Sequence, residues 1–88
     1  MKKENSFIST FVDGNITITM ENFYDKYDNI TSRRTSFQSE DVLDMHEVFV
    51  SVVISINSDI AEGLSIVGMD KTVSAHEGVF VTYVARRK

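Results

Sequence analysis

Two histidines are the side chains of this chain best suited to acid–base chemistry, but their sequence context does not favour it. His46 has aliphatic and aromatic neighbours three and four residues away, and no second histidine or carboxylate is placed to share a metal ion or to orient its ring. His76 lies beside Glu77 in a predicted turn. An acid–base pair would need the fold to bring the two together. We therefore expect His46 to be a partly buried structural residue.

Other residue types that support catalysis also lack the required pattern. The serines have no nucleophile-elbow context, and the carboxylates are spread along one predicted face instead of being paired in an apolar pocket. The 4 glycines are scattered and form no phosphate-binding loop. Because there is no cysteine, a disulfide or a thiolate metal site is impossible. The sequence predicts a non-enzymatic protein with no metal site and no cofactor.

The longest element in the sequence is a predicted amphipathic helix over residues 39–62. Ser39 is a suitable N-cap, and Gly63 is suited to end the helix. The predicted buried face spans an arc of about 100° and consists of Val42, Met45, Phe49, Val52, Val53, Ile56 and Ile60. Residues 48–56 are rich in β-branched side chains and would also suit a strand. The polar residues on either side keep helical spacing, so we favour the helix.

A second apolar row on this helix has two interpretations. The row consists of Leu43, Val50, Ile54 and Ala61, spaced 7, 4 and 7 residues apart. It could be a second wall of the same core, in contact with the C-terminal strands, which small domains need. Alternatively, it could be a self-association seam that forms a homodimer, because this spacing suits helix–helix packing.

The residues before the helix predict strands. Residues 7–12 and 15–20 flank Asp13-Gly14, a strong hairpin signal, which would place Phe11 opposite Ile16 and leave a threonine-lined face in solvent. Asn22–Asp28 is predicted to be a loop and Asn29–Gln38 a polar third strand. A short helix over residues 20–30 is the alternative, because its apolar residues also have helical spacing.

The residues after the helix predict a short apolar segment, Leu64–Val67, and a hairpin of Lys71–Ser74 with Val79–Arg86. The last strand is apolar on both sides, which indicates either a central position in the sheet or burial on both faces. We therefore predict an α+β fold, in which an antiparallel sheet of four or five strands carries the helix 39–62 on one face. A single domain, 1–88, would contain the N-terminal strands (5–38), the helix (39–62) and the C-terminal strands (64–88).

Charge is distributed unevenly along this small acidic chain of 88 residues, whose net charge is −4. Residues 39–62 contain six of the 13 acidic side chains and neither lysine nor arginine, whereas the remainder has 9 basic and 7 acidic residues. An uneven charge distribution of this kind influences the choice of binding partner more than it influences the fold. Because no apolar run approaches the roughly 20 residues of a membrane span and no signal-peptide pattern is present, we expect a cytoplasmic protein without membrane contact.

Two groups of residues are candidates for binding a partner. A protein partner is predicted to contact an aromatic cluster and the acidic helix face, namely Phe23, Tyr24, Tyr27, Asp44 and Glu47. RNA phosphates are the alternative partner, which would require the basic residues to converge in space, namely Arg33, Arg34, Arg86, Arg87 and Lys88.

The function predicted from these observations is binding to another protein. In size and composition the chain is similar to the compact accessory proteins with which bacteriophages inhibit host enzymes or host-defence systems, which implies action in the host cytoplasm. This similarity extends to no sequence motif. A small RNA-binding accessory protein that uses the arginines is the alternative, and a small enzyme that uses His46 or His76 is the third hypothesis.

Overall fold

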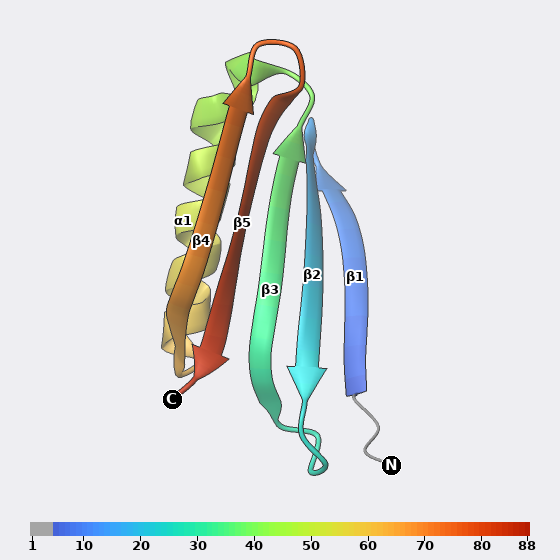
Figure 1. Cartoon of the computed structure of the whole chain (residues 1–88), viewed down its shortest axis with the longest axis vertical. Helices are drawn as coiled ribbons and strands as arrows, with labels where there is room; N and C mark the ends of the chain where they lie inside the picture. The colour runs from blue at the N-terminus through green and yellow to red at the C-terminus, as the bar shows by residue number, and fades with distance from the viewer. Residues whose placement is uncertain (1–4) are drawn as a thin grey trace.

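The structure is a computed structural model that describes residues 5–88, and it consists of one antiparallel sheet with one helix on it (Figure 1). The sheet has five strands in the order β1-β2-β3-β5-β4, and the helix connects β3 to β4. The strands are β1 (Asn5–Asp13), β2 (Ile16–Tyr24), β3 (Ile30–Ser39), β4 (Leu64–Ser74) and β5 (Gly78–Arg87). The predicted α+β fold, with an antiparallel sheet and a helix on one face, is confirmed.

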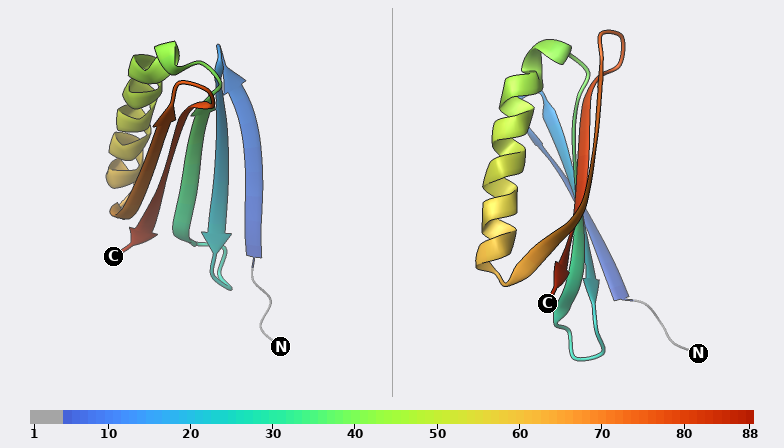
Figure 2. Two further views of the ribbon diagram at one scale, coloured as in Figure 1. Left: turned by 45° about the horizontal axis from the view of Figure 1, so that its top comes forward. Right: turned by 60° about the vertical axis from the view of Figure 1, so that its left-hand side comes forward.

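The helix covers only part of the sheet. It contacts β3, β4 and β5 on one side of the sheet, whereas β1 and β2 extend beyond it (Figure 2). Every residue of β1 is exposed except Ser9, which is half-buried. The protein therefore has a covered half and an uncovered half of the same sheet face.

The first hairpin forms, but its turn lies one residue later than predicted. Asp13 pairs with Ile16, so the two turn residues are Gly14 and Asn15, and Phe11 lies opposite Ile18 instead of Ile16. Gly14 has a φ of +63° and Asn15 has a negative φ, as in a type II′ turn, where glycine occupies the first central position. This turn type places glycine first, whereas the Asp-Gly prediction placed it second. The strand faces are nevertheless as predicted, because the register differs by two residues.

The predicted loop over Asn22–Asp28 is shorter than expected, because β2 continues to Tyr24. The turn that follows is held by Asp25, whose Oδ1 accepts hydrogen bonds from the backbone N–H groups of Tyr27 and Asn29 at 2.8 and 3.0 Å. The hydrogen bond from the Asn29 backbone is the main reason that the pKa of Asp25 is lowered. The alternative of a helix over residues 20–30 is wrong, and the predicted third strand forms as β3.

The helix begins later than predicted. Ser39 is the buried last residue of β3 and not an N-cap, and its hydroxyl donates to Asp44 Oδ2 at 2.7 Å. Asp41 caps a 3₁₀ turn, η1 (Val42–Asp44), by accepting from the backbone N–H of Leu43 at 2.9 Å. The α-helix α1 (Met45–Ala61) follows directly and ends before Gly63, as predicted.

The face that α1 turns toward the sheet differs from the predicted one. Its buried residues are Val48, Val52 and Asp59, with Ser55 half-buried on the same side. Val52 was predicted correctly, and Val42, Phe49 and Ile56 are partly buried, but Met45, Val53 and Ile60 are exposed. The helix is therefore rotated toward its polar side relative to the prediction.

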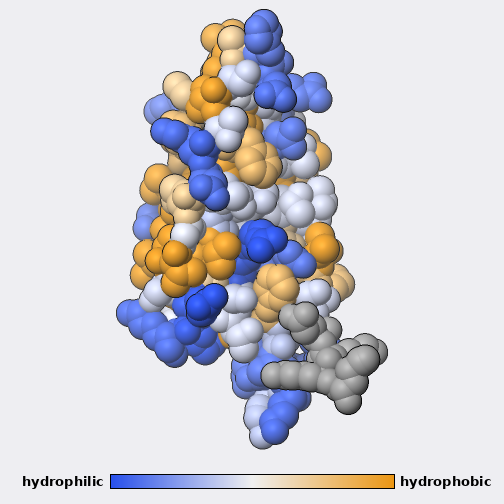
Figure 3. Space-filling view, viewed as in Figure 1, coloured by the Kyte–Doolittle hydropathy of each residue, from blue (hydrophilic) through white to orange (hydrophobic). Residues whose placement is uncertain are grey.

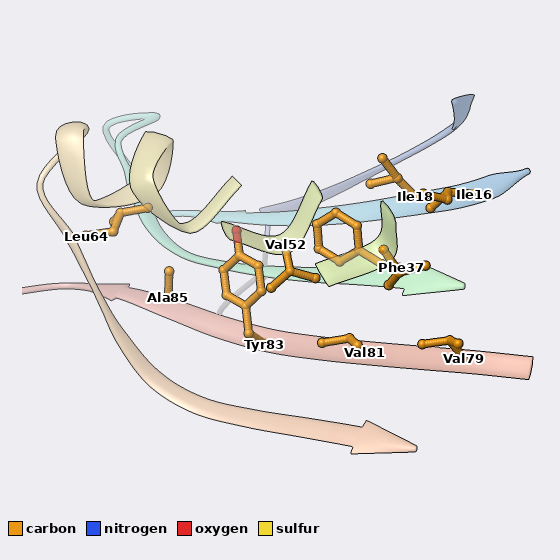
Figure 4. Packing of buried hydrophobic residues seen from close by; sticks show 10 residues of the cluster. Ile16, Ile18, Phe37, Val52, Leu64, Val79, Val81, Tyr83 and Ala85 are labelled. Atoms are coloured by element: carbon orange, nitrogen blue, oxygen red, sulfur yellow. The ribbon is translucent and has the colours of Figure 1, made fainter. Parts of the chain in front are cut away.

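The core lies between α1 and the covered half of the sheet. Its centre is Tyr83 on β5, whose ring lies 6.2 Å from that of Phe37 on β3 and packs beside Val52 of the helix (Figure 4). β5 is central, between β3 and β4, as its apolar sequence predicted. The two C-terminal segments predicted before and after residue 68 form one strand, β4, with an irregularity between Ile66 and Gly68.

The opposite face of the sheet carries no helix among the described residues and is largely polar. Hydroxyl side chains occupy neighbouring positions across it, as where Ser36 Oγ lies 3.0 Å from Thr82 Oγ1. In the view from this side the centre of the molecule is pale or blue, and hydrophobic side chains gather along the edge formed by β4 and α1 (Figure 3). A solvated polar face is typical of a two-layer antiparallel fold.

Candidate protein-interaction surfaces

A buried polar network between sheet and helix sets the rotation of α1. Arg33 Nη1 on β3 donates to Asp59 Oδ1 at 2.6 Å and to Glu62 Oε2 at 2.8 Å. Tyr83 Oη on β5 donates to Asp59 Oδ2 at 2.6 Å and lies 2.5 Å from Ser55 Oγ. Two strands thus present polar groups to the same turn of the helix. Asp59, only 1% exposed, must face them to be paired.

The network also shifts the pKa values of Tyr83 and Arg33. Burial raises the pKa of Tyr83 to about 12, and its hydrogen bond to Asp59 acts in the same direction. Burial alone would lower the pKa of Arg33, but the hydrogen bonds to Glu62 and Asp59 outweigh it and raise that pKa. Tyr83 is therefore uncharged at neutral pH. The network consists of a buried ion pair between Arg33 and Asp59 and an uncharged hydrogen-bond donor, Tyr83.

Because Asp59 and Ser55 face the sheet, aliphatic residues of the helix face solvent. We call the exposed aliphatic residues on the outer side of η1 and α1 the outer ridge, namely Leu43 in η1 and Val50, Val53, Ile54 and Ile60 in α1. Leu43 is 85% exposed and Ile54 65% exposed. The interpretation of Leu43, Val50, Ile54 and Ala61 as a second wall of the core is wrong, because all four are exposed. The structure does bring them onto one surface, so their role in self-association stays a prediction.

The two flanks of the outer ridge differ in character. Asp44 and Glu62 lie on the β3 side, as their bonds to Ser39 and Arg33 show. Phe49 lies on the β4 side, where Lys71 Nζ is 5.7 Å from its ring centre. Glu47 is exposed. The ridge therefore has an acidic border along one side and an apolar border along the other.

The predicted aromatic cluster does not form one surface. Phe23 and Tyr24 are consecutive residues of β2, so their side chains point to opposite faces of the sheet, and both are half-buried. Tyr27 is exposed in the following turn, with Lys26 Nζ 5.2 Å from its ring centre. Strand alternation separates residues that are neighbours in the sequence. Asp44 is the last residue of η1 and Glu47 lies in the first turn of α1, so both belong to other elements than Phe23 and Tyr24 of β2.

The predicted basic residues converge only in part. β3 pairs with β5, and its register places Ser32 opposite Arg86 and Arg34 opposite Val84, so that Arg34 and Arg86 are diagonal neighbours on the open face. Arg33 is buried in the network and is not available to RNA. Arg87 Nε donates to the backbone oxygen of Ile30 at 2.7 Å. Lys88 is exposed after the end of β5. Arg34 Nη1 lies 3.9 Å from Glu21 Oε1 on β2.

Edge strand β1 is a candidate surface: the sequence interpretation included a sheet edge among the possible binding surfaces but assigned no residue to it. Phe7 and Phe11 lie on the helix side of the sheet beyond the reach of α1, and Ile8 and Val12 lie on the other side; all four are exposed. Strand alternation predicted which residues share a face, but it assigned Phe7 and Phe11 to the core. The missing information was how far the helix reaches across the sheet.

The two histidines with catalytic potential lie on different elements. His46 is exposed on the helix, contrary to the expected partial burial, and His76 is exposed in the β4–β5 turn. Residues 5–88 contain no group of three histidine, cysteine or acidic side chains that could hold a metal ion. A surface hollow of about 430 Å³ beside the β3–η1 connection is lined mainly by acidic and amide side chains, including Gln38, Glu40 and Asp41.

Comparison with protein-family models, with curated proteins and with solved structures found no match to this chain. Within the described residues, no helix has the length and apolar character needed to cross a membrane.

Proposed function

We propose that this protein is a non-enzymatic binding module that inserts the outer ridge of α1 into an apolar groove on another protein. The observation that supports this proposal is the exposure of Leu43, Val50, Val53 and Ile54 on the side of the helix that faces away from the sheet. A surface helix ordinarily has one apolar stripe, which it buries, and polar residues on its other side. Here the sheet covers one side, and a partner would cover the other.

The ridge has the spacing of a helix that docks in a groove. Val50, Val53 and Ile54 occupy positions i, i+3 and i+4, part of the spacing by which such helices are recognised, and Ile60 lies seven residues after Val53. Each aliphatic side chain that becomes fully buried contributes roughly 1.5–3 kcal/mol, so three or four partly exposed anchors are sufficient for a specific complex.

The charges beside the ridge indicate the chemistry of the partner. Residues 39–62 contain six acidic side chains and no lysine or arginine, and Glu47, Asp41 and Glu62 are exposed. Complementary potentials increase the association rate and select among partners. The partner groove is therefore apolar at its centre and rimmed by lysine or arginine. An enzyme or defence protein with such a groove would be inhibited if the groove is needed for its activity.

The proposal is tested by affinity capture from an extract of the encoding organism or its host, using the wild-type chain, Ile54→Glu and Thr72→Glu. Thr72 is an exposed residue of β4, so its substitution adds the same charge outside the ridge. We expect Thr72→Glu to retain a captured protein that Ile54→Glu loses. A photoreactive phenylalanine derivative at Val50, but not at Thr72, should crosslink to that protein. Equal capture by all three chains, or crosslinking only from Thr72, would refute the proposal.

Nuclease treatment of a second portion of each extract separates the RNA alternative from the protein proposal. If the partner is RNA, capture disappears with nuclease and falls steeply with salt. Arg34→Ala with Arg86→Ala would then weaken it, because these two residues are neighbours on the open face. A partner retained after nuclease and lost with Ile54→Glu supports the helix proposal.

A further inference from the structure

The second unexplained surface is edge strand β1, which is separate from the outer ridge. The two edges of the sheet differ in their protection against pairing. β4, at one edge, carries Asp70 and Lys71 in mid-strand and is interrupted by an irregularity near Gly68. Charges and irregularities of this kind keep sheet edges from pairing with other chains. β1 has neither: from Asn5 to Asp13 it contains no lysine, arginine or proline, and its only charge is Asp13 at its end.

The open edge of β1 presents an identifiable set of backbone groups. In an antiparallel pair, residues that exchange backbone hydrogen bonds alternate with residues that do not. The two residues that flank a two-residue turn exchange them, here Asp13 and Ile16. Every second residue of β1 counted back from Asp13 therefore bonds to β2. The intervening residues direct their N–H and C=O groups toward the open edge, namely Ser6, Ile8, Thr10 and Val12.

We infer that two copies of the chain pair antiparallel through β1, about a two-fold axis at Ser9, to form one continuous ten-stranded sheet. This register pairs all nine residues of β1, and Ser9 faces Ser9 of the second copy. It aligns Ile8 with Thr10 of the second copy and Ser6 with Val12, which satisfies about eight backbone hydrogen bonds. The result is an isologous dimer, the most common form of homo-oligomer.

The side chains of β1 are self-complementary in this register. Phe7 faces Phe11 of the second copy, and Phe11 faces Phe7, so that four rings gather on the helix side next to Ile18 and Met20. Asp13 faces Asn5 of the second copy, so that no like charges meet. A shift by two residues would place Phe11 opposite Ser9 and leave two residues of each strand unpaired. The pattern therefore matches a second copy in one register.

The area available is sufficient for a reversible dimer. With roughly 200 Å² per phenylalanine side chain, exposures of 63% for Phe7 and 47% for Phe11 leave about 200 Å² of aromatic surface on each copy. Two copies bring together about twice that area, in addition to the paired backbone and the exposed Ile8 and Val12. A total of roughly 1,000 Å² is at the lower limit of specific interfaces. We therefore expect a concentration-dependent dimer.

The first test reads the register by disulfide formation, because the chain has no cysteine of its own. Ser9→Cys places the new thiol opposite its counterpart in a pair whose Cα atoms are about 4.5 Å apart, within the range that disulfides bridge. Oxidised glutathione as oxidant should give a covalent dimer of Ser9→Cys within minutes. Ile8→Cys and Thr10→Cys are matched controls whose thiols are out of register with themselves, and they should react at least roughly tenfold more slowly. Faster crosslinking of either control would overturn the inferred register.

The second test measures association without a crosslink. Light scattering and sedimentation of the wild-type chain from about 1 µM to about 1 mM should show monomer and dimer in exchange. Phe7→Lys with Phe11→Lys places like charges opposite each other, whereas Phe7→Glu with Phe11→Lys removes the same rings and places opposite charges together. The first variant should dimerise at least roughly tenfold more weakly than the second. Circular dichroism of both variants verifies that they are folded.

Two results would refute the inference. One is a wild-type chain that is monomeric over the whole concentration range, which would leave the edge to a strand of a different protein. The other is a dimer that persists in Phe7→Lys with Phe11→Lys and is lost in Leu43→Glu with Ile54→Glu. That dimer would form through the outer ridge of the helix.

Discussion

Removal of the charge of Asp59 should strongly destabilise the protein. Asp59 is 1% exposed and bonds to both Arg33 and Tyr83. In Asp59→Asn the guanidinium of Arg33, itself nearly buried, keeps its hydrogen bond to Asn22 Oδ1 and a single acidic partner, Glu62, whose side chain is 49% exposed. Breaking a buried pair by removing one partner costs about 3–5 kcal/mol. Because Glu62 still compensates part of the charge, we expect a loss of about 3 kcal/mol.

This loss is large relative to the total stability of the domain. At roughly 0.05–0.15 kcal/mol per residue, a chain of 88 residues has a free energy of unfolding of about 4–13 kcal/mol. Urea unfolding, followed by far-ultraviolet circular dichroism and extrapolated linearly to water, measures the difference directly. If the free energy of unfolding falls with urea concentration at the same slope in both proteins, the variant still unfolds from the same compact state.

A double substitution separates the cost of an unpaired charge from the value of the pair. In Arg33→Met with Asp59→Leu both charges are absent, and apolar replacement of a buried pair is often neutral or stabilising. We expect this variant to lie within about 1 kcal/mol of the wild type, with Tyr83 still bonded to Ser55. If Asp59→Asn instead costs less than about 1 kcal/mol, the network does not set the rotation of the helix.

Three further predictions concern buried residues of the sheet. The pKa of Tyr83 is raised to about 12 in the folded state from about 10 in the unfolded chain. The stability that Tyr83 contributes is therefore complete below about pH 10 and is lost as the pH rises through about 12. Between these pH values the wild type should lose about 2–3 kcal/mol more of its free energy of unfolding in urea than Tyr83→Phe. Gly78 has a φ of +93°, and a Cβ there would lie 2.0 Å from the Ser39 backbone oxygen. Gly78→Ala should therefore lower the free energy of unfolding, measured by thermal unfolding, by about 3 kcal/mol or more. Gly14→Ala, at a site with open space, should lower it by less. Buried Thr35 Oγ1 has no hydrogen-bond partner among the described residues; Thr35→Val should therefore raise stability by about 1 kcal/mol, and a loss of that size would indicate an internal water bound there.

Strand and helix positions were largely predictable because local signals determine them. The end of the helix at Gly63 and the central position of β5 follow from a helix stop signal and from apolar alternation on both strand faces. The start of the helix was predicted too early. Ser39 has a good capping side chain, but pairing with Val79 of β5 keeps it in the sheet, and Asp41 caps the first turn instead.

The buried face of the helix was not predictable from hydrophobicity alone. Val48 occurs in neither of the two stripes assigned from the sequence, yet it is fully buried. Aliphatic residues surround most of the helix, so the apolar pattern allows several rotations that differ little in buried area. The decisive partners, Arg33 and Tyr83, are 26 and 24 residues from Asp59 in the chain. No local pattern connects residues at that distance.

The rotation that pairs Asp59 also places Val53 and Ile60 on the outer ridge instead of in the core. A rotation of α1 by about 100° would bury Val53 and Ile60, each worth roughly 1.5–3 kcal/mol when fully covered. It would turn Val48 and Val52, which are now buried, away from the core at a similar cost. It would also leave Arg33 without Asp59 in the core, at a cost of about 3–5 kcal/mol, and would withdraw Asp59 from Tyr83. The aliphatic terms therefore nearly cancel, and the buried network favours the observed rotation. Places where local pattern and fold disagree are commonly functional, and here the disagreement falls on the outer ridge.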